Sequence, residues 1–187
     1  MEHTMTHPMS LQKQQLYIEV CVDALEPFGD LLEVGFGGGL SPSHIQSYFP
    51  KSHTIIEPRQ KEIVKAREWM THYTHIHLIE TAWEESLYGL GVFDAIFLNE
   101  DPLIYDHKEE RLFSFFEQCL SGHMRRGSRL SCCLYDPTSK YQDRIWLEKV
   151  LSSPFLDCQE RKIPVDRSIC GSSLQAVEAL VITIIKK

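Results

Sequence analysis

The sequence predicts an α/β fold: a doubly wound, mostly parallel sheet of seven strands that ends in a C-terminal antiparallel hairpin. From residue 31 onward, short apolar runs alternate with stretches whose apolar residues recur at helical spacing, the pattern of repeated strand–helix units. The last two strand-like stretches have no helical pattern between them, and strands joined by a loop pair antiparallel.

The parallel strands are predicted from five apolar runs, at residues 31–34, 54–57, 76–79, 94–98 and 129–135, and the hairpin strands at 155–165 and 176–185. Helical spacing marks segments near residues 41–49, 63–70, 112–120 and 147–151, with an amphipathic lead-in helix at 16–25. Ligands of such sheets bind beyond the carboxyl ends of the strands, near the point where the strand order reverses. Functional residues are therefore expected just after positions 34, 57, 80 and 98.

Composition indicates one globular domain spanning residues 1–187, with residues 1–10 flexible. The chain has no apolar run of the roughly 20 residues that a membrane span needs, and no signal-peptide pattern, so a cytoplasmic protein is expected. The net charge of −7 argues against nucleic acid as a partner. The six cysteines form no C-x-x-C pair, which favours reduced thiols. His72, His75 and His77 have no nearby cysteine that would complete a usual zinc set, and no metal is expected.

A glycine-rich loop follows the first predicted strand, in the sequence Glu33-Val34-Gly35-Phe36-Gly37-Gly38-Gly39-Leu40. Glycines there let a ligand approach the main chain. A dinucleotide fingerprint needs a third glycine, which here is Leu40, whereas E-x-G-x-G is the arrangement that binds S-adenosylmethionine. Glu57, at the end of the second strand, can accept hydrogen bonds from both hydroxyls of a ribose.

The chain resembles guanidinoacetate N-methyltransferase and its arginine-methylating relatives over about residues 31–102. The residues that carry the resemblance are Leu32-Glu33-Val34-Gly35-Phe36-Gly37, Ile55-Ile56-Glu57, Trp83-Glu84-Glu85, and Phe93 to Leu98 with Pro102. It implies a Rossmann-like methyltransferase with S-adenosylmethionine as cofactor. Glu33, Gly35, Phe36, Gly37, Glu57, Trp83, Glu84 and Asn99 would then contact that cofactor, Trp83 and Glu84 beside the adenine.

The resemblance is weaker for the methyl acceptor. In the family an aspartate at the end of the fourth strand holds a guanidine, and the matching residue here is Asn99. Asn99 can orient an amine but cannot act as a base, so Glu100 or Asp101 would supply the negative charge. The expected partner is a small-molecule or guanidine-bearing acceptor. Two alternatives stay open: residues 99–102 form only a polar turn, or the domain is a scaffold or regulator that binds the cofactor without catalysis.

Overall fold

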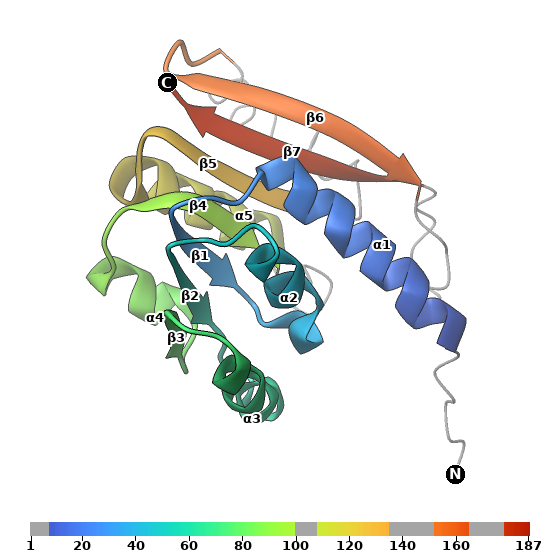
Figure 1. Ribbon diagram of the computed structural model, residues 1–187. Helices are drawn as coiled ribbons and strands as arrows, with labels where there is room; N and C mark the ends of the chain where they lie inside the picture. The colour runs from blue at the N-terminus through green and yellow to red at the C-terminus, as the bar shows by residue number, and fades with distance from the viewer. Residues whose placement is uncertain (1–7, 100–107, 135–151, 165–177) are drawn as a thin grey trace.

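The structure, a computed structural model, describes residues 8–99, 108–134, 152–164 and 178–187 (Figure 1). Its sheet has seven strands in the order β3-β2-β1-β4-β5-β7-β6. The strands are β1 (Asp30–Val34), β2 (Ser52–Ile56), β3 (Ile76–Ile79), β4 (Phe93–Leu98), β5 (Met124–Leu134), β6 (Leu156–Pro164) and β7 (Glu178–Lys186). β1 to β5 run parallel, and β7 is antiparallel to both of its neighbours, β5 and β6. The predicted doubly wound, Rossmann-like sheet with a C-terminal antiparallel pair is confirmed.

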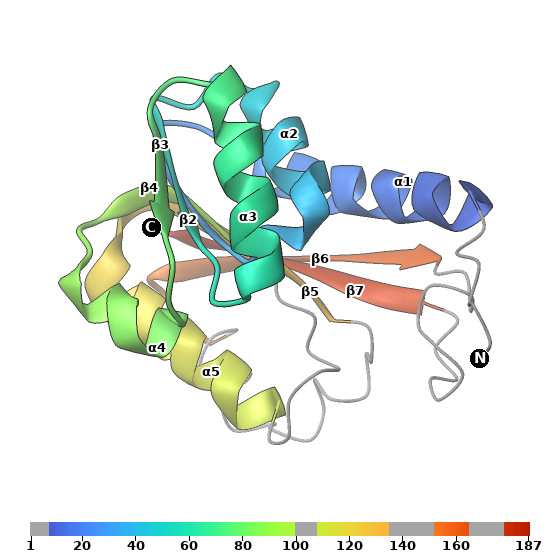
Figure 2. The same cartoon turned by 90° about the horizontal axis from the view of Figure 1, so that it is seen from below.

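Helices cover both faces of the sheet (Figure 2). Those on one face are α1 (Pro8–Leu25), α2 (Leu40–Gln46) and α3 (Gln60–Trp69), and those on the other are α4 (Trp83–Ser86) and α5 (Lys108–Gln118). Each face has its own buried apolar cluster, with Val22, Leu31 and Ile45 on the first side and Leu32, Ile96 and Phe116 on the second. Among the described residues, no helix is both long and apolar enough to cross a membrane.

Two predicted boundaries lie several residues away from the observed ones. α1 begins at Pro8 rather than at residue 16; proline is tolerated in a first helical turn, and the glutamine- and lysine-containing stretch after it favours helix. The flexibility of residues 1–10 stays a prediction. β5 begins at Met124 rather than Arg129, and its pairing with β4 is irregular between Phe93 and Ala95. The predicted helix at 147–151 lies outside the described residues.

Candidate functional site

Backbone hydrogen bonds hold together the carboxyl ends of four strands. The amide of Gly35, after β1, donates to Ile56 O (2.8 Å), and that of Asn99, after β4, donates to Val34 O (2.8 Å). The amide of Glu57, after β2, donates to Ile79 O of β3 (3.0 Å). The strand order reverses between β1 and β4, so these residues lie at the position where sheets of this kind bind ligands.

The glycine loop is exposed at Gly38 and buries its one large side chain. Gly35, Gly37, Gly38 and Gly39 all have positive φ, between 58° and 93°, which other residues rarely adopt. A Cβ on Gly38 would meet no atom within 4 Å, whereas one on Gly37 would lie 2.3 Å from Asn99 Nδ2. Phe36 is 1% exposed and packs edge-on against Trp69, with ring centroids 5.7 Å apart. The loop therefore offers backbone, not side chains, to a ligand.

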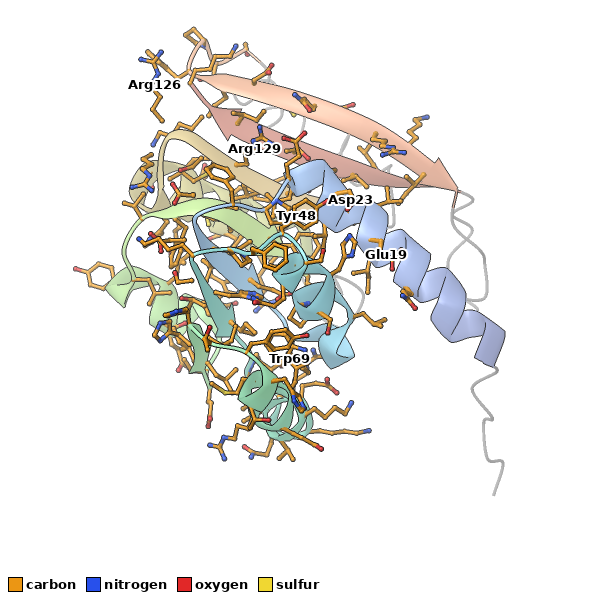
Figure 3. The ribbon with its side chains drawn as sticks, in the orientation of Figure 1. Glu19, Asp23, Tyr48, Trp69, Arg126 and Arg129 are labelled. Carbon is orange, nitrogen blue, oxygen red and sulfur yellow. The ribbon has the colours of Figure 1, made fainter. Side chains whose placement is uncertain are left out.

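Trp69 packs against the buried side of this loop. It is the last residue of α3, and its indole N–H donates a hydrogen bond to Ser43 Oγ of α2 (2.9 Å; Figure 3). Its ring also lies edge-on to the imidazole of His53, with centroids 6.3 Å apart. Trp69 thus links α2, α3 and the buried side of the glycine loop.

Glu57 lies beside the loop, and its side chain is fully buried. Its carboxylate accepts hydrogen bonds from the Phe36 amide (Oε2, 2.8 Å) and from the Arg59 amide (Oε1, 2.9 Å). The Arg59 guanidinium adds two more, from Nε to Oε1 (2.8 Å) and from Nη2 to Oε2 (2.9 Å). Burial alone would raise the pKa of Glu57, but the bonds from Arg59 and Phe36 outweigh it and hold that pKa below its ordinary value. Glu57 is therefore a charged acceptor bonded to the main chain of the glycine loop.

Glu33 is fully buried beneath the loop, on the face that α2 and α3 cover. Its carboxylate accepts a hydrogen bond from Ser41 Oγ and lies 2.9 Å from His53 Nε2, with both side chains of the Glu33–His53 pair inaccessible to solvent. Burial raises the pKa of Glu33 more than these donors and Asn99 lower it. The contacts that the structure describes for Glu33 support the loop from inside, and direct contact with a cofactor stays a prediction.

Asn99 is bound to the same group of residues. Its Nδ2 donates to Ser41 Oγ (2.6 Å) and to Gly35 O (3.2 Å), so the amide nitrogen faces the glycine loop. A carboxylate at this position would have no hydrogen to donate to either acceptor. Glu100 and Asp101, the predicted sources of negative charge, lie outside the described residues.

Trp83 and Glu84 begin α4, on the other face of the sheet. Trp83 is 2% exposed, packs edge-on against Phe115 with centroids 5.2 Å apart, and has the Arg111 guanidinium 5.4 Å from its ring centre. Glu84 forms an ion pair with the same Arg111. These contacts place Trp83 in the core, and a role for the pair beside an adenine stays a prediction.

Sequence reasoning missed three residues that complete the site: Ser41, His53 and Arg59. A signal for His53 did exist, because a glutamate within a buried strand needs a buried partner and His53 lies on the neighbouring strand. Arg59 gave no such signal, since arginines at helix starts are usually solvated. Among the residues that the structure describes, no group of three or more histidine, cysteine, aspartate or glutamate side chains is placed to hold a metal ion.

The sequence model of the guanidinoacetate N-methyltransferase family matches residues 11–143 of the chain. The fold is shared with the N-methyltransferase NodS from Bradyrhizobium japonicum, solved with S-adenosylhomocysteine, at a TM-score of 0.68 and 13% identity over 97% of this chain and 89% of that one. Precorrin-6y C5,15-methyltransferase from Geobacter metallireducens aligns with a TM-score of 0.66 and 13% identity, covering 98% and 94% of the two chains. An O-methyltransferase from Bacillus cereus, also solved with S-adenosylhomocysteine, aligns with a TM-score of 0.64 and 15% identity over 99% of this chain and 84% of that one.

Proposed function

Because the chain belongs to the guanidinoacetate N-methyltransferase family, we propose that it transfers a methyl group from S-adenosylmethionine to an amine, guanidine or arginine-like acceptor. The observation that carries the proposal is the contact between the glycine loop and Glu57. The Phe36 amide donates to the carboxylate, so a buried, charged acceptor lies against a stretch of glycine main chain. That combination suits a ligand whose ribose diol bonds to Glu57 while the adjoining part of the ligand lies close to the main chain of the glycine loop.

The residues present fit the cofactor. Glu57 would accept the ribose hydroxyls, and Gly35, Phe36 and Gly37 would line the adjoining part with their main chain. The loop is open to a ligand at Gly38, since a Cβ there would meet no atom within 4 Å beyond its chain neighbours. When bound, S-adenosylmethionine supplies an electrophilic methyl group on a sulfonium. Trp83 and Glu84 are proposed for the adenine end, as the family resemblance implies.

The protein's own contribution to methyl transfer is alignment and proton removal. An attacking nitrogen must present a free lone pair in line with the methyl group, and a nearby carboxylate can orient it and take its proton. We assign the base to Glu100 or Asp101, the two residues that come after Asn99 in the sequence. Asn99, whose Nδ2 is bound to the loop, would act by holding the loop and the start of this segment in place.

The test is formation of S-adenosylhomocysteine with a panel of amines, guanidines and free arginine. Turnover with at least one acceptor is expected. Glu100→Gln or Asp101→Asn, whichever removes the base, should lower kcat by about 10²- to 10⁴-fold, the usual contribution of general base catalysis. The dissociation constant of that variant for S-adenosylhomocysteine should stay within a few-fold of the wild-type value. Full activity in both variants would remove the segment from the site.

A second candidate is a scaffold or regulator that binds the cofactor without catalysis. The orientation of Asn99 favours it, because the position that holds the family aspartate is used here to bind Ser41 and Gly35. The Asn99→Asp variant separates the two. An enzyme whose base lies at 100 or 101 needs no such change, whereas activity that emerges only in Asn99→Asp would identify a fold that has lost catalysis.

A further inference from the structure

The carboxylate of Glu57 already carries as many donors as its two oxygens accept. A carboxylate has roughly four lone-pair positions. Two are filled by main-chain amides, of Phe36 and Arg59, and two by the Arg59 guanidinium. Any further pair of donors, such as a ribose diol, must therefore displace a pair that is already bound.

The two kinds of donor differ in how easily they can leave. The Phe36 amide belongs to the glycine loop, and the Arg59 backbone caps the start of α3, where Arg59 O accepts a hydrogen bond from the Ile63 amide (3.0 Å). Moving either amide would disrupt a loop or a helix start. The guanidinium is attached to a long side chain that is 44% exposed, while Glu57 beneath it is inaccessible. The guanidinium is thus the exchangeable partner.

The guanidinium and the diol also have the same bonding pattern. Arg59 presents two N–H groups side by side, one to each carboxylate oxygen. A ribose presents two neighbouring O–H groups in the same way. We propose that the Arg59 side chain and the ribose of S-adenosylmethionine compete for Glu57, so that Arg59 sets the affinity for the cofactor. This inference rests on the proposed function, because it takes the ribose site to be Glu57.

The test is calorimetric titration of the full chain with S-adenosylhomocysteine. Arg59→Ala is expected to bind about three- to tenfold more tightly than wild type, the equivalent of a partly exposed ion pair. Arg59→Lys should lie between them, since an ammonium cannot bridge both oxygens as a guanidinium does. Arg125→Ala is the matched control: Arg125 is also about half exposed and binds one carboxylate, that of Asp94, through two nitrogens, at the opposite end of the strands. Its affinity should equal that of wild type.

Two further readouts separate competition from a structural effect. Salt weakens exposed ion pairs, so wild-type affinity should rise with added NaCl while that of Arg59→Ala changes much less. In competition experiments, adenosine should gain affinity in Arg59→Ala, whereas 2′,3′-dideoxyadenosine, which lacks the diol, should not. Unchanged or weaker binding of S-adenosylhomocysteine by Arg59→Ala would overturn the inference while leaving the proposed function standing. Failure of both wild type and Arg59→Ala to bind would overturn the proposed function and this inference together.

Discussion

Replacing Glu57 with alanine is expected to weaken S-adenosylhomocysteine binding by roughly 100- to 10,000-fold, because hydrogen bonds to a charged acceptor contribute about 1.5–3 kcal/mol each and the ribose would lose two. The measurement is calorimetric titration of both proteins.

The negative charge of Glu57 also makes cofactor binding depend on pH. Since the pKa of Glu57 is held below its ordinary value, affinity should be constant around neutral pH and fall only as the pH drops through that lowered value.

Asp30→Ala is the control for the Glu57→Ala variant. Asp30 begins β1, at the opposite end of the strands from the glycine loop, and its carboxylate accepts hydrogen bonds from Lys51 and Ser52. Its loss should leave affinity unchanged. Thermal unfolding must show that Glu57→Ala remains folded, because the Phe36 amide loses its acceptor. A loss of affinity below about tenfold in a folded protein would mean that the ribose is held elsewhere, since even one such bond contributes more.

Replacing Glu33 with alanine is expected to cost about 2–6 kcal/mol of stability, because two buried donors would lose their acceptor and each such group costs about 1–3 kcal/mol. Ser41 and His53 would each lose an acceptor with no water to replace it. For a chain of this size, the unfolding midpoint should fall by about 4–24 °C. Differential scanning calorimetry near neutral pH measures it directly.

Two comparisons sharpen the Glu33 experiment. Glu33→Gln keeps one acceptor oxygen and the shape of the side chain, so its loss of stability should be smaller than that of the alanine variant. Glu80→Ala removes an exposed partner of an ion pair with Arg67 and should change stability by about 1 kcal/mol or less. Equal small effects of Glu33→Ala and Glu80→Ala would show that the buried group beneath the glycine loop does not stabilise the fold.

The strand and helix order, and the meeting of Glu57 with the glycine loop, could be predicted because they depend on local patterns. Apolar runs mark strands, glycines mark the turn after β1, and parallel strands bring their carboxyl ends to one edge. The position of Glu57 follows from these rules alone. Its bond to the Phe36 amide was not predicted from the sequence.

The surroundings of Glu33 and Glu57 could not be predicted in the same way. Glu33 contacts His53 because β1 and β2 pair with Leu31 opposite His53. This register cannot be deduced from the sequence. Arg59 covers Glu57 through a side-chain conformation, which no periodicity encodes. Trp83 is a similar case, because burial against Phe115 depends on how α5 packs on the sheet.

The central claim is that the glycine loop and Glu57 bind S-adenosylmethionine, and thermal unfolding with S-adenosylmethionine, S-adenosylhomocysteine and NAD in parallel tests it most directly. A ligand at about 100 times its dissociation constant adds roughly 2.7 kcal/mol of stability. For this chain that raises the midpoint by about 5–10 °C. The account predicts this rise with the two adenosyl ligands and none with NAD. No rise with either adenosyl ligand, or an equal rise with NAD, would contradict it.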